Sequence, residues 1–170
     1  MLRMFGAILL TIGAAAVGFS AAGSLRRRVV SLRALIGALE LMDRELAFRL
    51  TPIPELFALL SQRTQAPACD FFAHCLSGME RLGEQTLSQI WHTALTSYSM
   101  DLHGEDRDAL EALGEVLGRY DGPGQRAALE EIHARLIRCL SHAEEEFLRM
   151  GRVYGALGLT AGSFLAVLLL

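Results

Sequence analysis

The sequence predicts an all-α protein, in which a cytosolic bundle of about six helices is flanked by N- and C-terminal transmembrane helices. Three observations predict this fold. Apolar residues recur at spacings of three and four through most of the chain, which is the period of an amphipathic helix. No segment alternates convincingly with period two, so strands have no support. Long uncharged apolar stretches occupy both ends, and we expect three units: 1–25, 26–152 and 153–170.

The first apolar stretch predicts a membrane anchor. Residues 4–25 carry no charged side chain, and that length suits a helix that crosses a bilayer. Arg26, Arg27 and Arg28 follow at once, and basic residues that flank a span stay in the cytosol. The alternative is a cleavable signal peptide with Arg3 at its start. The length of the apolar run and the positive charge after it both favour a retained anchor.

The last apolar stretch mirrors the first. Residues 154–170 carry no charge, and Arg149 and Arg152 lie just before them. The stretch is at the short end of the range for a spanning helix, roughly 17 residues. Its basic flank again faces the central region, so both spans place that region on the cytosolic side. The alternative is a buried apolar helix in a soluble core.

Between the spans, the apolar spacing predicts a helix in each of six ranges: 29–50, 53–63, 67–82, 87–98, 104–119 and 125 onward. Apolar residues of the first range form one stripe, which includes Leu32, Leu35, Leu39 and Met42. The first helix is placed to continue from the N-terminal span and the last to run into the C-terminal span, but the sequence leaves open whether they do so without a break. The terminal helices of the bundle should then lie side by side and antiparallel.

Residues typical of helix ends separate these ranges. The Thr-Pro-Ile-Pro segment at 51–54 supplies prolines suited to a first helical turn. Gly83 is placed to end the third helix, and Thr86 with Gln89 resembles a capping box. The Asp-Gly-Pro-Gly segment at 121–124 interrupts the helical pattern before the last helix.

The charge pattern suggests one surface for a partner. The net charge of −3 is small, so bulk electrostatics indicate no polyanion partner. Residues 101–121 nevertheless hold seven acids and two arginines. Four of these acids could form an exposed face for a basic partner: Glu105, Asp106, Asp108 and Glu111. A merely solvated helix face is the alternative.

The residues needed for common catalytic sites are missing. The chain has no lysine, which excludes a P-loop or a lysine Schiff base. It also has no His-Glu-x-x-His or Cys-x-x-Cys motif, and on one helix Cys69 and Cys75 would point in different directions. We expect no enzyme activity, cofactor, metal site, small-molecule substrate or nucleic-acid partner.

Three segments together resemble a known family. The first is Leu-Thr-Pro-Ile-Pro-Glu-Leu at 50–56, and the second is 110–130, with Leu113, Gly114, Leu117 and Gly118. The third is the glycine-rich C-terminal stretch. Taken in order over the whole chain, they resemble the stage III sporulation protein AB family of endospore-forming bacteria. The Gly-Pro-Gly segment at 122–124 departs from the family pattern and leaves the continuity of the fifth and sixth helices open.

The resemblance implies a cellular role. Members of that family lie in the mother-cell membrane around the forespore, within a secretion-like complex that links the two cells. The component is similar to the platform protein of type II secretion and type IV pilus systems. The implied partners are a secretion-type ATPase, similar to stage III sporulation protein AA, and other membrane subunits. The function so implied is a non-enzymatic scaffold; a secreted or tethered helical binding module on the outer face of the membrane is the alternative.

Two surfaces are candidates for the ATPase. One is the acidic face at 105–115, and the other is the turn and helix at 51–63, with Thr51, Pro52, Pro54 and Glu55. We expect charge reversal of Glu105, Asp106 and Asp108 to abolish co-purification with the ATPase and to leave the fold intact.

Overall fold

The computed structural model describes residues 2–48, 51–117 and 123–169, and it leaves the side chains of 1–22, 123, 152 and 154–170 outside the description. The described residues form six α-helices and one 3₁₀-helix, with no β-strand. The all-α prediction is confirmed. The elements are α1 Leu2–Phe48, α2 Ile53–Arg63, α3 Ala68–Gly78, η1 Met79–Arg81, α4 Leu87–Ser97, α5 Gly104–Leu117 and α6 Pro123–Leu169.

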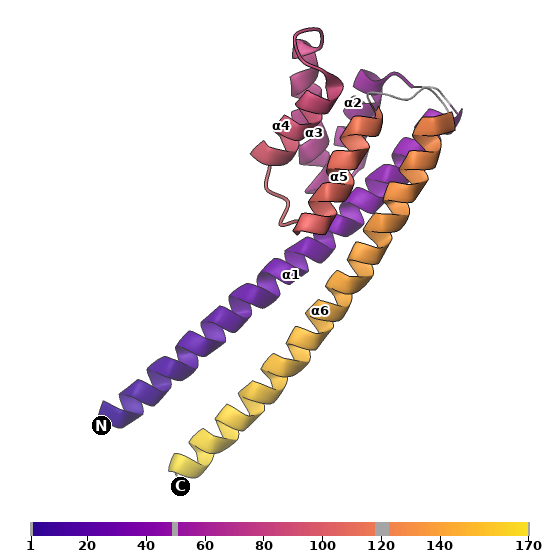
Figure 1. Ribbon diagram of the computed structural model, residues 1–170. Coiled ribbons are helices and arrows are strands. Elements are labelled where there is room, and N and C mark those ends of the chain that lie inside the picture. Colours follow the sequence, from indigo (N-terminus) through magenta and orange to yellow (C-terminus); the bar gives the residue numbers. More distant parts are fainter. Residues whose placement is uncertain (1, 49–50, 118–122, 170) are drawn as a thin grey trace.

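Two long helices define the shape of the molecule. Helices α1 and α6 have 47 residues each, and at a rise of 1.5 Å per residue each is about 70 Å long. They run side by side and antiparallel, with both chain termini at the same end (Figure 1). The short helices α2–α5 pack at the other end (Figure 1). We call α2–α5, with residues 25–48 of α1 and 124–150 of α6, the head.

The structure answers the question of continuity that the sequence left open. Helix α1 passes without interruption from the apolar stretch into the head, and α6 passes from the head into the second apolar stretch. The predicted spans, 1–25 and 153–170, fall mostly on residues whose side chains are outside the description. Within the part that is described, no helix is both long enough and apolar enough to cross a membrane.

Local sequence signals account for most helix boundaries. The capping box of α4 is present: the Gln89 N–H donates to Thr86 Oγ1 over 3.3 Å, and the Thr86 N–H donates to Gln89 Oε1 over 2.9 Å. Gly83, in the turn before it, has φ of +116°, a conformation that favours glycine. Helix α3 ends at Gly78 and η1 adds one turn, so this segment ends at Arg81, one residue before the predicted end.

The head has one apolar core built on α1 and α6. The predicted stripe on α1 is confirmed, because Leu32, Leu35, Leu39 and Met42 are buried. Aromatic rings from three helices pack at its centre, with centroid separations between 4.8 and 6.1 Å: Phe57, Phe71, Phe72 and Trp91. The core therefore ties the short helices to the long ones.

The packing of Trp91 explains why residue 114, in the 110–130 segment that resembles the family, is a glycine. Its indole Nε1 donates a hydrogen bond of 2.7 Å to the carbonyl oxygen of Leu110 on α5. That contact places the indole ring directly over the next turn of α5. A Cβ atom at Gly114 would lie only 2.3 Å from the ring, so α4 and α5 can pack this closely only with glycine at that position.

Candidate functional site

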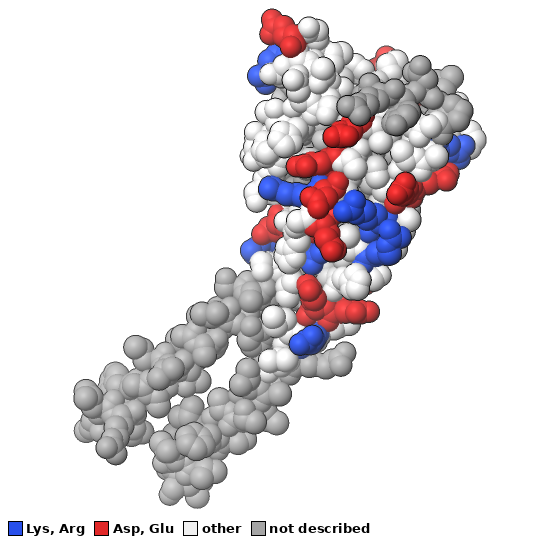
Figure 2. Space-filling view, in the orientation of Figure 1, with Lys and Arg blue, Asp and Glu red and all other residues white. Residues whose placement is uncertain are grey.

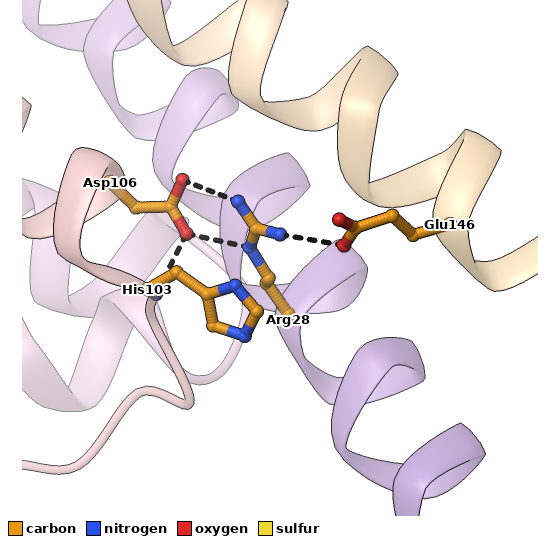
Figure 3. Close-up of polar contacts among 4 residues, drawn as sticks. All are labelled: Arg28, His103, Asp106 and Glu146. Carbon is orange, nitrogen blue, oxygen red and sulfur yellow. Dashed lines mark hydrogen bonds and ion pairs between the residues drawn. The ribbon is translucent and has the colours of Figure 1, made fainter.

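A buried ion pair joins three helices at the base of the head, and Arg28 of α1 is its centre. Arg28 Nε and Nη2 donate to the two carboxylate oxygens of Asp106 on α5, over 2.8 and 3.0 Å. Its Nη1 donates to Glu146 Oε2 on α6 over 3.2 Å. Figure 3 shows the guanidinium group lying between the two carboxylates. One side chain thus connects α1, α5 and α6.

Asp106 has a second role at the start of α5. It is the third residue of that helix, where an acidic side chain can reach back to the residue that precedes the first turn. Its Oδ2 accepts a hydrogen bond of 2.9 Å from the backbone N–H of His103 (Figure 3). The same carboxylate therefore caps α5 and holds Arg28.

Both side chains of the pair are buried, so each charge depends on the other for compensation. The Arg28 side chain is 6% exposed and that of Asp106 is 0% exposed. Burial alone would raise the pKa of the Asp106 carboxyl, but hydrogen bonds from Arg28 and the His103 N–H, with the charge of Arg28, hold that pKa below its ordinary value. The hydrogen bond to Asp106 raises the pKa of Arg28 despite its burial. Both groups are ionised at neutral pH, and either would be strongly destabilising if left alone.

Exposed ion pairs surround the buried one. Arg27 Nε lies 3.0 Å from Asp101 Oδ2, in the loop before α5. Arg33 Nη2 lies 2.6 Å from Glu144 Oε1 on α6. Such exposed pairs each contribute little to stability, typically about 0–1 kcal/mol.

Two further contacts continue along α1 and α6 toward the far end of the head. Glu40 Oε1 lies 3.7 Å from His133 Nε2, and Asp43 Oδ1 lies 3.5 Å from Arg126 Nε. As the residue numbers on α1 rise, those on α6 fall, in keeping with antiparallel packing. Together with the contacts of Arg28 and Arg33, these contacts follow the same antiparallel register.

The structure corrects the predicted acidic face in one respect. Asp106 is buried, so the expectation that it lies on an exposed face, and that its charge reversal leaves the fold intact, is wrong. Glu105, Asp108 and Glu111 are exposed as expected, and Glu111 Oε1 lies 3.6 Å from His92 Nδ1. In Figure 2, acidic and basic side chains are interspersed on the visible face of the head.

The other predicted surface residues fall in several environments. Pro52, Pro54 and Glu55 are exposed at the start of α2, while Thr51 is half-buried and donates a hydrogen bond of 3.2 Å to Glu45. Three of the arginines expected to flank the membrane are exposed, namely Arg26, Arg27 and Arg149. The side chain of Arg152 lies outside the description. Arg28 is instead buried in the head.

A signal for the buried pair was present in the sequence. Asp106 precedes Ala109, Leu110 and Leu113 at helical spacing, and Arg28 similarly precedes Leu32 and Leu35. Each charge therefore falls on the buried stripe of its own helix. The spacing could therefore have indicated that both charges are buried, although it does not say that they pair with one another.

Two of the three cysteines have the character of core residues. Cys75 and Cys139 are buried. Burial raises the pKa of the Cys75 thiol, and burial together with a hydrogen bond to Asp106 raises that of Cys139. Both thiols therefore stay protonated and are poor nucleophiles at neutral pH. The described residues also contain no group of three side chains placed to hold a metal ion.

Comparisons with known proteins identify the family. The family model for stage III sporulation protein AB matches residues 3–170. The Stage III sporulation protein AB of Bacillus subtilis (strain 168) is 23% identical over 177 residues, and the alignment covers 100% of both chains. A solved structure of Stage III sporulation protein AB (SpoIIIAB) has a TM-score of 0.64 at 20% identity and covers 72% of this chain and 97% of that chain. These relatives are named as sporulation proteins and not as enzymes. The chain therefore belongs to the stage III sporulation protein AB family.

Proposed function

We propose that this protein is a non-enzymatic platform subunit of a secretion-like sporulation complex, held at both ends in the mother-cell membrane. In this proposal the head lies in the mother-cell cytosol and engages the secretion-type ATPase of the complex. Membership of the family supports the link to sporulation. The uncharged residues 4–25 and 154–170 support anchoring in the membrane.

The observation that carries the proposal is the buried contact of Arg28 with Asp106, together with its contact with the exposed Glu146. Arg28 lies three residues after the first apolar stretch, and Glu146 lies eight residues before the second. These separations correspond to about 5 and 12 Å along the helix axes. The contact thus binds α1 to α6 beside the proposed membrane surface and binds both to α5. A mechanical force applied to the head would be transmitted to the two apolar stretches through the continuous helices α1 and α6.

A topology experiment tests the membrane part of the proposal. The exposed turn at Gly83 and Glu84, between η1 and α4, is a suitable place to insert a reporter. A fluorescent protein that folds in the cytosol should be active there, and alkaline phosphatase, which needs export, should be inactive. The full chain should also stay in membranes washed with carbonate. An active phosphatase, or a mature N-terminus near Gly23, would instead favour a module on the outer face.

A second experiment tests contact with the ATPase. Glu105 and Asp108 are exposed on the first two turns of α5, and neither forms an ion pair within the described part of the chain. The variant Glu105→Arg/Asp108→Arg should reduce recovery of the ATPase in a pull-down by about tenfold or more, because like charges at an interface cost several kcal/mol. Asp106 stays unchanged, so the head keeps its buried ion pair.

The matched control reverses two acids elsewhere on the head. Glu80 and Glu84 are equally exposed, near η1. The variant Glu80→Arg/Glu84→Arg has the same net charge as the test variant and should recover the ATPase as the wild type does. Equal recovery in both variants would remove the α5 surface from consideration and leave the start of α2 as the candidate.

A further inference from the structure

A groove opens beside α1 at the base of the head, immediately after the first apolar stretch. It has a volume of about 500 Å³ and is walled by α1, the loop that precedes α3 and the loop that leads into α5. Arg26, Arg27 and Val30 line it from α1, Pro67 lines it from the residue just before α3, and Met100 and Asp101 line it from the loop before α5. The groove therefore combines positive charge with apolar walls.

The positive charge of the groove comes from Arg26 and Arg27 of α1. The Arg27 side chain is 61% exposed, and its Nε lies 3.0 Å from Asp101 Oδ2. The terminal N–H groups of the guanidinium can therefore donate to another acceptor. Asp101 itself has φ of +50°, a conformation that few residues adopt. Arg26 is exposed and has no ion-pair partner among the described residues. With two arginines and one aspartate, the groove carries an excess of one positive charge.

The apolar wall of the groove is partly exposed. The Val30 side chain is 47% exposed although it lies between buried turns of α1. Met100 is 3% exposed and forms part of the wall where the loop meets α1. A ligand that fits here must place an anionic group on the arginines and apolar groups against Val30. A free phosphate ion would satisfy only the arginines.

We propose that this groove binds an anionic phospholipid, with the phosphate on Arg26 and Arg27 and the upper part of an acyl chain against Val30. The inference rests on the membrane anchoring proposed above. Arg26 directly follows residues 4–25, so anchoring would place the groove at the level of the lipid headgroups. Anionic headgroups attract arginines that lie at this level. Bound lipid would fill the space between α1 and the loop before α5, next to the Arg28–Asp106 pair.

Lipid retention by the full chain tests this proposal. The protein is reconstituted in nanodiscs of phosphatidylcholine with phosphatidylglycerol, extracted in mild detergent and examined by native mass spectrometry. The wild type should retain phosphatidylglycerol in preference to phosphatidylcholine. The variant Arg26→Gln should retain about fivefold less of it, and Arg26→Gln/Val30→Asp should retain still less. The control Arg138→Gln, which changes an exposed arginine on α6, should behave as the wild type does.

Three outcomes would overturn the lipid site: equal retention of the two lipids, no loss in Arg26→Gln, or displacement of bound lipid by millimolar inorganic phosphate. A melting curve for each variant separates a lost site from a lost fold. The carbonate wash described above is independent of this assay. A wild type that stays in washed membranes but shows no lipid preference refutes the lipid site alone, whereas complete release by carbonate refutes the anchoring.

Discussion

Replacing Asp106 by asparagine should lower the stability of the head by about 3–5 kcal/mol, because Arg28 would lose its buried counter-ion and keep only the exposed carboxylate of Glu146. The reverse change, Arg28→Met, should cost a similar amount by stranding the Asp106 carboxylate. Trp91 is the only tryptophan of the chain and is buried in the head. Its fluorescence during denaturant unfolding of the detergent-solubilised protein reports these changes directly.

A double variant separates the ion pair from the packing around it. In Arg28→Met/Asp106→Leu no buried charge remains, and such apolar replacements are often neutral or stabilising. The His103 N–H would still lose its acceptor, a loss of about 1–3 kcal/mol. The double variant should therefore recover most, but not all, of the stability lost in either single variant.

The exposed pair of Arg33 with Glu144 provides the control. Its side chains are 63% and 39% exposed, so Arg33→Met should cost less than about 1 kcal/mol. If Asp106→Asn costs no more than Arg33→Met does, the buried pair is not what joins α5 to the two long helices.

The same pair should make the stability of the head depend on acid pH. The pKa of Asp106 is lowered in the folded protein, so its contribution is complete above the unfolded pKa, about 3.9, and is lost as the pH falls through the folded pKa. Denaturation measured from neutral pH to below pH 4 should therefore show a steeper decline for the wild type than for Arg28→Met/Asp106→Leu. Parallel curves would count against ionisation of Asp106 in the folded state.

The second large effect is expected where Trp91 packs on Gly114. In Gly114→Ala the new Cβ would lie 2.3 Å from the indole ring, and overpacking of this kind costs typically about 1–3 kcal/mol. Gly37→Ala is the matched control, since Gly37 is within α1 and a Cβ there would meet no atom within 4 Å. That variant should gain roughly 0.5–1 kcal/mol from helix propensity.

A double-mutant cycle shows whether the ring causes the penalty. Trp91→Leu alone should be destabilising by several kcal/mol, on the order of 3–5, because it leaves a cavity in the aromatic core. In that background Gly114→Ala should no longer destabilise, since the atoms that it would meet are gone. Thermal unfolding followed by circular dichroism measures all four proteins. Simple additivity of the two changes would show that Gly114 is needed for a reason other than contact with Trp91.

The sequence alone was sufficient for the all-α class and the positions of the helices. It also predicted the capping box at Thr86 and Gln89 and the buried stripe of α1. These features depend on backbone hydrogen bonds and side-chain spacings that extend over only three or four residues. The local sequence therefore contains the information that specifies them.

Only the tertiary structure revealed the partner of Arg28. From the sequence, Arg28 belonged to a basic membrane flank and Asp106 to an acidic surface, because each had the sign of its neighbours. The two residues are 78 positions apart, and no helical period relates charges at that distance. Their contact depends on how α5 packs against α1 and α6, which bury both groups together. Once both groups are removed from water, pairing compensates their desolvation. Two residues that looked like surface charges in the sequence therefore form the contact that joins α5 to the two long helices.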